Sequence, residues 1–291
     1  MSDELTELAT EAALEAERQF VLTLGGFALE IPGATLVTHE KIPAPRFNFV
    51  QEMGVGPERQ TAFFERALDH YFQRALRPTF RVPLPVPDHV DAGLRRFSFR
   101  PRASPLVLLL STGAKPHEFG ENIEVSVAER RELDLIASFW TSSGERPEFR
   151  SALDVAWGHP NPNEGLAPLL ARMDGEPVAS ALVYRYRTSA GIHAVATQPS
   201  ARGRGAASAL VAFALEHEPV GPKVRYSIFS DSARLESRLE RLGFRRARAF
   251  QEYELPPGAA LAIPPAGPPL PPQWRPPRAP SGGAGTRGVP P

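Results

Sequence analysis

The stretch from Ile192 to Phe213 constrains the fold of this chain more than any other. It begins with a β-prone run that ends at Thr197, passes through a turn rich in glycine and arginine, and continues as a helical segment. A strand, a glycine-rich turn and a helix in this order place unpaired N–H groups and the positive end of the helix dipole at the turn. We therefore expect an anion-binding site here, of the kind that grips phosphate.

The turn carries both glycines and full positive charges. Gly203 and Gly205 let the backbone approach a ligand closely and adopt positive φ at little cost. Arg202 and Arg204 add two cationic side chains. The turn is not a Walker A loop, because no Gly-Lys-Ser/Thr follows the glycines. It is not the dinucleotide fingerprint either, because the pattern Gly-x-Gly-x-x-Gly is absent.

What the turn does match is Arg-x-x-Gly-x-Ala, from Arg202 to Ala207, preceded by a strand and a proline. This pattern resembles the acetyl-CoA pyrophosphate loop of the GCN5-related N-acetyltransferase (GNAT) family. Thr197-Gln198-Pro199 stands where the family has "VxP", and Leu242-Gly243-Phe244 resembles the "LGF" that follows its fourth helix. The resemblance covers about Glu124–Leu255, where the order of predicted elements is also that of the family.

Hydrophobic periodicity predicts an α/β chain whose second half forms a mixed sheet of the α+β type. The Asp174-Gly175 pair predicts a two-residue hairpin turn. We expect strands over 124–127, 165–173, 177–187, 192–197, 224–229 and 247–255, and helices over 128–139, 147–157, 202–217 and 233–242.

The first half is predicted to be a second, degenerate copy of the same arrangement. Its patterns favour a helix over 3–19, strands over 20–24 and 28–39, a helix over 58–76, a short helix over 90–97 and a strand over 106–110. We therefore expect a degenerate GNAT-like domain over 1–118 and a GNAT domain over 122–255. The run Gln51–Gly56 fits Gln-x-x-Gly-x-Gly, but Glu52 and Glu58 would repel a pyrophosphate. The pattern thus favours a first half without cofactor.

The composition changes at Pro256. The segment 256–291 holds 13 of the 32 prolines, three arginines and no acidic residue. Such a segment buries too little apolar surface to fold, so we predict a disordered proline-rich tail. Two interpretations of it stay open: a passive tail, or a docking segment through Trp274 for a protein partner.

Composition excludes several classes of function. Lysine plus arginine, 33, balance aspartate plus glutamate, 33, so we expect neither a nucleic-acid nor a membrane partner. Cysteine is absent, which removes disulfides and thiolate nucleophiles, and the seven histidines show no metal spacing, so we expect no metal. Without a signal peptide or membrane span in the pattern, we expect a cytoplasmic protein, monomeric or homodimeric.

The resemblance implies transfer of an acetyl group from acetyl-CoA to a primary amine of a small molecule or protein, directly in a ternary complex. A backbone N–H on the fourth strand, here among Val195, Ala196 and Thr197, would stabilise the charge that develops on the carbonyl oxygen. Ser232 occupies the position where the family often has an asparagine near the cofactor; a capping role is the alternative. The remaining expected cofactor contacts are Arg202, Gly203, Arg204, Gly205, Ala206 and Ala207.

The acid and the base are less well determined by the pattern. His193 is the first candidate for the base, because it lies on the fourth strand and imidazole suits proton abstraction. The family's acid is a tyrosine five positions before the phenylalanine of "LGF", but this chain has Leu239 there. Tyr226 on the next strand is the substitute we predict, and protonation of the departing thiolate by solvent is the alternative.

Two other functions stay open beside acetyl transfer. Leu239 favours a catalytically silent acyl-CoA-binding or regulatory module, and the proline-rich tail favours a scaffold. The acceptor pocket is expected between the first two helices of the second half, at about Phe139–His159, where Trp140, Trp157 and Glu145 are candidate lining residues.

Overall fold

One mixed sheet runs through the described part of the molecule. The computed structural model describes residues 3–114, 122–142, 148–157, 164–218, 220 and 224–256. Its strands lie in the spatial order β1 (Phe27–Ile31), β2 (Ala34–Thr38), β3 (Phe49–Gln51), β4 (Thr79–Pro83), β12 (Phe244–Glu254), β6 (Leu106–Ser111), β11 (Arg225–Ser230), β10 (Ser189–Thr197), β9 (Glu176–Tyr186), β8 (Glu164–Met173) and β7 (Ile123–Val127), with β5 (Arg100–Pro101) beside β12. This confirms the predicted mixed α/β fold.

Seven α-helices accompany the sheet in the described residues, together with four short 3₁₀ segments. The α-helices are α1 (Asp3–Thr23), α2 (Gln60–Phe72), α3 (Asp88–Arg96), α4 (Leu133–Ser142), α5 (Glu148–Trp157), α6 (Ala206–His217) and α7 (Ala233–Leu242). The 3₁₀ segments are η1 (Pro45–Phe47), η2 (Pro57–Arg59), η3 (Arg130–Glu132) and η4 (Pro199–Ala201).

The β8–β9 hairpin shows how local sequence sets the register. Asp174 and Gly175 both adopt positive φ, 53° and 83°, as a two-residue hairpin turn matched to strand twist requires. The flanking strands then pair from Met173↔Glu176 outward to Glu164↔Tyr186. The predicted hairpin turn is confirmed.

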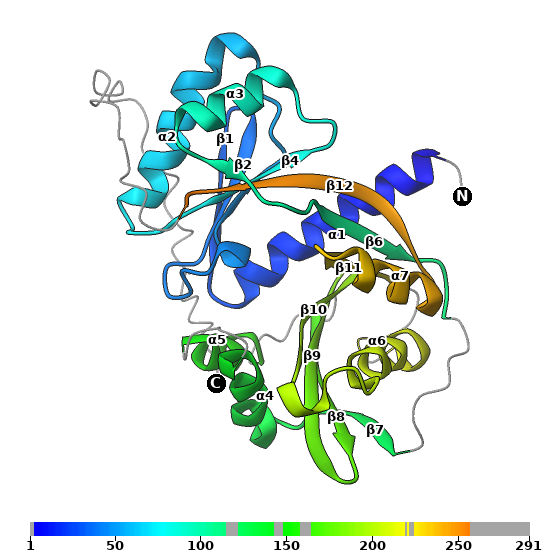
Figure 1. Cartoon of the computed structure of the whole chain (residues 1–291). Coiled ribbons are helices and arrows are strands. Elements are labelled where there is room, and N and C mark those ends of the chain that lie inside the picture. Colours follow the sequence, from blue (N-terminus) through cyan, green and yellow to red (C-terminus); the bar gives the residue numbers. More distant parts are fainter. Residues whose placement is uncertain are drawn as a thin grey trace, which may run out of the picture.

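The two halves of the chain exchange strands. β6, from the first half, lies between β11 and β12 of the second half. β12 is long enough to pair with β6 through its first part and with β4 of the first half through its second part. The sheet therefore joins in space the two halves predicted on either side of residues 118–122 (Figure 1).

The first half repeats the strand–helix–strand order of the second. Among the described strands, two neighbouring pairs are parallel: β3 with β4, linked through α2, and β10 with β11, linked through α6. Just before α2, Glu58 Oε1 lies 2.6 Å from the position that a Cβ atom on Gly56 would occupy. An acidic side chain thus lies where an anion would approach this turn, which agrees with the expectation that the first half binds no cofactor.

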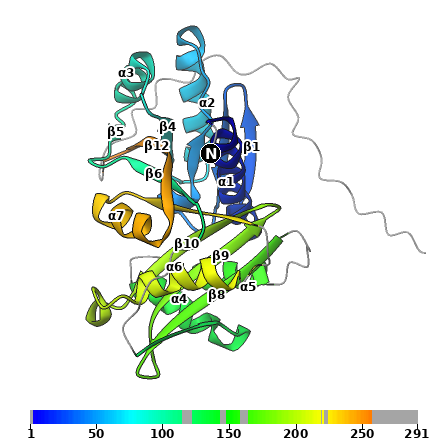
Figure 2. The same ribbon diagram turned by 90° about the vertical axis from the view of Figure 1, so that its right-hand side faces the viewer.

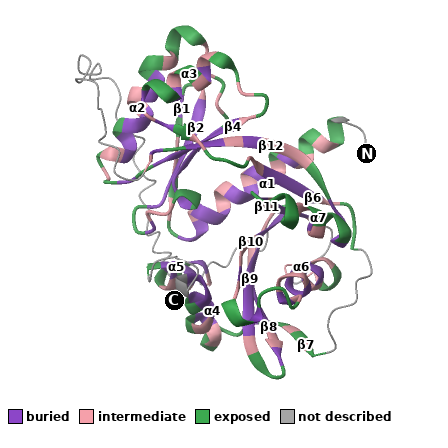
Figure 3. Ribbon diagram, in the orientation of Figure 1, coloured by how far each residue is buried: buried purple, intermediate pink, exposed green. Residues whose placement is uncertain are grey.

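Helices cover both faces of the sheet in the second half. α1, α4 and α5 lie on one side of β8–β10, and α6 lies on the other (Figures 1 and 2). Buried residues concentrate along β9 and on the helix sides that face it (Figure 3). α1 also packs Ala13 and Leu14 against Leu108, Leu110 and Phe250 of the exchanged strands, so a first-half helix covers the central sheet.

One expected strand is wrong. Residues 20–24 were predicted as a strand because of their β-prone side chains, but α1 continues through Thr23. The reason is tertiary: Phe20, Val21 and Leu24 lie on one helical face and are buried in the core cluster that also contains Trp140 and Tyr184. Packing of this face outweighs the local strand propensity. The proline-rich tail lies outside the described residues, apart from Pro256.

A chain of ion pairs is buried where α1, β4 and β12 meet. Arg81 Nη1 donates to Glu17 Oε1 at 2.7 Å, and Arg81 Nε donates to Glu252 Oε1 at 3.0 Å. Arg102 Nη1 then donates to Glu252 Oε2 at 3.1 Å, and its Nη2 donates to Asp231 Oδ2 at 3.4 Å. We call these five residues the buried ion-pair chain, although Arg102 and Asp231 reach the surface. It ties first-half elements to second-half ones.

Arg81→Leu is expected to lower the free energy of unfolding by about 3–5 kcal/mol, because it leaves the buried carboxylates of Glu17 and Glu252 without their common partner. Denaturant unfolding measures this change. The control is Arg131→Leu, which breaks an exposed pair with Glu129 and should change stability by no more than about 0.5 kcal/mol. An equally small effect of both substitutions would contradict a structural role for the ion-pair chain.

Candidate active site

The site begins where β10 and β11 separate. The two strands pair in parallel only over Ser189↔Arg225, Ala190↔Tyr226 and Gly191↔Ser227. β10 continues to Thr197 and β11 to Ser230 without further pairing between them. The separation opens the sheet at its centre and leaves one backbone edge of β10 facing the gap.

A β-bulge distorts β10 beside this gap. Its register with β9 passes from His193↔Leu182 to Ala196↔Ser180, so Ala194 and Val195 together oppose a single residue. Ala194 adopts φ of 55°, a left-handed conformation that is costly for a residue with a side chain. Strain of this kind is maintained by its surroundings and is enriched at functional sites. Val195 and Ala196, two of the three residues predicted to supply the oxyanion donor, line the cavity described next.

The glycine-rich turn forms the start of α6. Gly203 and Gly205 have φ of 82° and 98°, and Gly205 is the N-cap without a side-chain cap. The helix ladder begins when the Ala209 N–H donates to the Gly205 carbonyl at 2.9 Å, so the N–H groups of the residues just before it have no intrahelical acceptor. Arg202 and Arg204 are exposed beside this turn. The arrangement is that of a helix N-terminus suited to an anion.

A cleft of about 390 Å³ adjoins the gap between the strands and reaches the first turn of α6 at Ala207 and Ser208, whereas residues 202–206 do not line it. Its walls come from β10, β11, α6 and α7, together with Trp140 of α4 and Arg46 of η1. The lining residues are Arg46, Trp140, Ile192, Ala194, Val195, Ala196, Ala207, Ser208, Val211, Ile228, Phe229, Asp231, Leu235, Arg238, Leu239 and Leu242. We call this the strand-gap cleft.

Leu239 of α7 and Ser232, the residue before α7, differ in whether they line the strand-gap cleft. Leu239 is buried and lines the strand-gap cleft, so the position where the resemblance implies a tyrosine does face the cleft, and it carries a leucine. Ser232 is the N-cap of α7, but its side chain makes no capping hydrogen bond and does not line the cleft. Its neighbour Asp231 does line it.

A second cavity, of about 260 Å³, opens on the other side of the gap. It is lined by Glu17, Phe20, Val21, Pro45, Arg46, Phe47, Arg81, Arg102, Leu106, Trp140, Ile192, His193, Ala194, Phe229, Asp231 and Glu252. Six of these residues also line the strand-gap cleft: Arg46, Trp140, Ile192, Ala194, Phe229 and Asp231. The two spaces therefore adjoin at the separated strands. We call the second one the α1 cavity, because α1 forms one wall.

His193 lies in the α1 cavity. Its ring stacks on Phe20 with centroids 4.0 Å apart and 5° between the planes, and its buried Nε2 has no hydrogen-bond partner. Burial, together with the positive charges of Arg46 and Arg81, lowers the pKa of His193 to about 3. The imidazole is therefore neutral near pH 7 and weakly basic.

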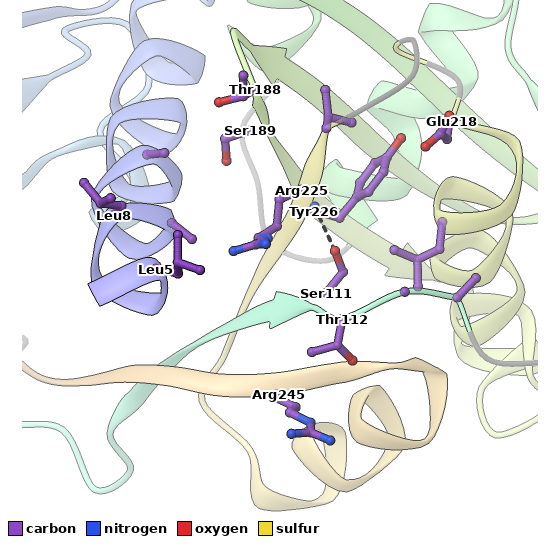
Figure 4. Close-up of a pocket in the computed structure, with 16 residues that line it drawn as sticks. Leu5, Leu8, Ser111, Thr112, Thr188, Ser189, Glu218, Arg225, Tyr226 and Arg245 are labelled. Atoms are coloured by element: carbon purple, nitrogen blue, oxygen red, sulfur yellow. Dashed lines mark hydrogen bonds between the residues drawn. The ribbon is translucent and has the colours of Figure 1, made fainter. Parts of the chain in front are cut away.

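Tyr226 lies elsewhere. It lines a larger cavity of about 810 Å³ at the paired end of β10 and β11, and it does not line the strand-gap cleft. Figure 4 shows its ring directed toward Glu218, with Leu5 and Leu8 of α1 across the cavity. Its backbone N–H donates to Ser111 Oγ at 3.0 Å, and burial raises the pKa of its phenol. The structure thus brings His193, but not Tyr226, to the gap.

Several lining residues have no signal in the local sequence. Glu17, Arg81 and Glu252 reach the α1 cavity from α1, β4 and β12, which are far apart in the chain. Trp140 lines both cavities, whereas Trp157 lines neither and packs against the core cluster that contains Trp140. Glu145 lies outside the described residues.

Over the described residues, no group of three or more histidine, cysteine, aspartate or glutamate side chains is placed to hold a metal ion. None of the helices found there is both long and apolar enough to cross a membrane.

His193→Gln is expected to flatten the loss of stability at acid pH. The folded-state pKa lies below the unfolded value of about 6.5, so the unfolded state binds a proton that the folded state does not, and stability falls as pH drops below about 6.5. The slope is at most about 1.4 kcal/mol per pH unit. Urea unfolding at pH 7 and pH 5 should therefore show a smaller difference for the variant, by up to about 2 kcal/mol.

The control for this comparison is His217→Gln, at an exposed position of α6. It should retain the wild-type difference between the two pH values. A His193→Gln protein with the wild-type difference would mean that the imidazole is protonated in the folded state.

One segment of the second half matches a family model. Residues 132–219 match the model of the acetyltransferase (GNAT) family, a segment that runs from η3 through the glycine-rich turn and α6. No curated protein matches the chain in a sequence search.

Solved structures resemble the chain over most of its length. A GCN5-related N-acetyltransferase from Kribbella flavida has a TM-score of 0.61 at 18% identity and covers 84% of this chain and 95% of its own. A functionally unknown conserved protein from Staphylococcus epidermidis has a TM-score of 0.58 at 10% identity, over 80% and 95%. A GCN5-related N-acetyltransferase from Sphaerobacter thermophilus has a TM-score of 0.54 at 15% identity, over 77% of each chain. At these identities the likeness concerns the fold, and the family model matches the segment 132–219.

Proposed function

We propose that the protein transfers an acetyl group from acetyl-CoA to a primary amine, with the cofactor in the strand-gap cleft and the amine in the α1 cavity. The observation that carries this proposal is the meeting of the two spaces at the separated strands, where they share six lining residues. A thioester in one space and an amine in the other would face each other across the gap. Direct transfer needs this proximity and no covalent intermediate on the enzyme.

The residues around the turn fit the diphosphate of the cofactor. The uncapped N–H groups at the start of α6 point toward the turn, Gly203 and Gly205 leave room for a close approach, and Arg202 and Arg204 add charge. The pantetheine arm would then follow the open edge of β10 toward the bulge. Apolar side chains of α6 and α7, such as Val211 and Leu239, fit its methyl-bearing carbons.

The backbone at the bulge would stabilise the negative charge that develops during the reaction. In the proposed complex a backbone N–H of Val195, Ala196 or Thr197 donates to the thioester oxygen, which becomes an oxyanion as the amine attacks. The strained Ala194 beside them supports this placement, because it holds the backbone out of regular pairing. Since Tyr226 lies outside the cleft, we assign protonation of the departing thiolate to solvent in place of the phenol.

A second candidate function rests on Leu239. With a leucine at the position facing the cleft, the domain would bind acyl-CoA and not turn it over. Release of free CoA in the presence of an amine separates the two candidates. The chain contains no cysteine, so a thiol reagent reports the released CoA without background from the protein.

Gly205→Glu is expected to weaken acetyl-CoA binding at least about 100-fold, because it places a side chain and a negative charge at the N-cap of α6. Isothermal calorimetry measures the dissociation constants. The matched control is Gly175→Glu in the β8–β9 turn, another positive-φ glycine with open space around it, which carries the same backbone penalty and charge away from the cleft. Its affinity should stay within about twofold of wild type.

Equal affinities of all three proteins would contradict the placement of the diphosphate. Failure of the wild-type protein to bind acetyl-CoA would contradict the proposed function itself.

A further inference from the structure

The first half of the chain presents one carboxylate with a free oxygen to the α1 cavity. Glu17 is 7% exposed and lines this cavity. Its Oε1 accepts a hydrogen bond from Arg81, whereas its buried Oε2 has no hydrogen-bond partner. A buried carboxylate oxygen without a partner costs free energy. Such an atom beside a cavity therefore indicates that a ligand supplies the missing donor.

Glu17 is not alone in this respect. Trp140 Nε1 and His193 Nε2 are also buried and without partners, and both residues line the same cavity. The three residues belong to α1, α4 and β10, so side chains with an unpartnered polar atom line the cavity from different elements. One unpartnered polar atom is weak evidence for a ligand. Three in residues that line the same cavity indicate which donors and acceptors a ligand would carry.

The three atoms fit an amine that also carries an oxygen. An ammonium group has three donors, which match the Glu17 carboxylate oxygen and the acceptor nitrogen of a neutral His193. The indole N–H of Trp140 only donates, so it matches a carbonyl, hydroxyl or carboxylate oxygen of the bound molecule or of the thioester. Trp140 lines both spaces, which allows either partner.

The other acidic groups of the cavity are less suited to receive the amine. Glu252 has both oxygens engaged, Oε1 by Arg81 and Oε2 by Arg102. The Asp231 side chain is 52% exposed and pairs with Arg102, so water already solvates it. Among the carboxylates that line the cavity, Glu17 combines burial with an unused oxygen. Burial also raises the pKa of Glu17 against the opposing charge of Arg81, which makes the carboxylate a stronger base.

We propose that Glu17 binds the ammonium group of a small primary amine and takes its proton, so that the first half of the chain supplies the acceptor site; this rests on the proposed acetyl transfer. The cavity of about 260 Å³ lies near the lower end of the range for small-molecule sites, about 300–1,000 Å³. Its walls include α1, η1, α4, β4, β6, β10, β11 and β12. This enclosure favours a small amine that bears an oxygen over a protein acceptor.

Glu17 Oε2 takes one proton from the ammonium, and the free amine attacks the thioester carbon. The carbon–nitrogen bond forms, the carbon–sulfur bond breaks, and the electron pair leaves with sulfur. The second nitrogen proton is lost to solvent as the amide forms, the thiolate is protonated by solvent, and Glu17 returns its proton to solvent. The products are the acetamide, free CoA and one net proton.

Glu17→Gln tests the proposal with wild-type protein, acetyl-CoA and a panel of small primary amines: an amino acid, an amino alcohol, an amino sugar and a diamine. A lysine-bearing peptide is included as the protein-type acceptor. Released CoA is followed with a thiol reagent. We expect kcat/KM for the best small amine to fall at least about 100-fold at pH 7, with unchanged acetyl-CoA affinity by calorimetry.

The pH dependence distinguishes a base from a residue that only supports the fold. As the pH approaches the pKa of the free amine, the amine loses its proton without help, so the ratio of wild-type to variant kcat/KM should shrink toward one. A purely structural defect would keep the ratio constant. The charged groups around Glu17 are shared by both proteins: Arg81 on β4, Glu252 on β12, His193 on β10, Arg46 on η1, and Arg102 and Asp231 beside them.

Two further variants keep the test independent of folding. Glu252→Gln makes the same carboxylate-to-amide change on the other side of Arg81, and its defect, whatever its size, should not converge with wild type as pH rises. Glu17→Asp keeps the charge beside Arg81 but draws the carboxylate back by one carbon, and we expect about a tenfold loss. It serves as the test if Glu17→Gln does not fold.

Each outcome is decisive. Turnover of a small amine with a convergent Glu17→Gln defect supports the proposal. Turnover that the Glu17 variants leave at the wild-type rate, a defect that is constant with pH, or turnover of the peptide alone overturns it and leaves acetyl transfer standing. Acetyl-CoA binding without turnover of any amine overturns the proposed function as well, in favour of the silent module.

Discussion

The separation of β10 from β11 is the feature on which the rest of the site depends. Three residue pairs hold the strands together, and beyond them the sheet opens at its centre. An opening in a sheet leaves backbone groups without partners, and the bulge at Ala194 turns this edge further from regular pairing. Because of the gap, a cleft on one side and a cavity on the other share a boundary, which is what a reaction between two bound molecules requires.

The first half of the chain closes this arrangement. Its strand β6 continues the sheet past β11, and its helix α1 forms a wall of the α1 cavity. The corresponding turn in the first half has Glu58 beside Gly56, where the second half has arginines beside glycines. This turn therefore lacks the basic side chains of an anion site, while the exchange of strands and the buried ion-pair chain tie the first half to the second.

Local sequence predicted the features that depend on local chemistry. Short motifs predicted the glycine-rich turn before α6 and the Asp174-Gly175 hairpin. The motif Leu242-Gly243-Phe244 also identified position 239, a leucine that lines the cleft. Glu17, Arg81 and Glu252 could not be predicted in the same way, because 64 and 171 positions separate Arg81 from its two partners. Their meeting depends on how β4, β12 and α1 pack. The prediction of a strand over 20–24 was wrong for the same reason, because the stacking of Phe20 on His193 is a tertiary contact.

The proposed acetyl transfer requires that acetyl-CoA and the amine meet at the gap between β10 and β11. A crystal structure of the protein with bound acetyl-CoA tests this most directly. The account predicts the diphosphate at the start of α6 and the thioester at the bulge of β10, with the acetyl carbon open toward the α1 cavity. Acetyl-CoA bound in the cavity beside Tyr226, or lying with its thioester away from the gap, would contradict it.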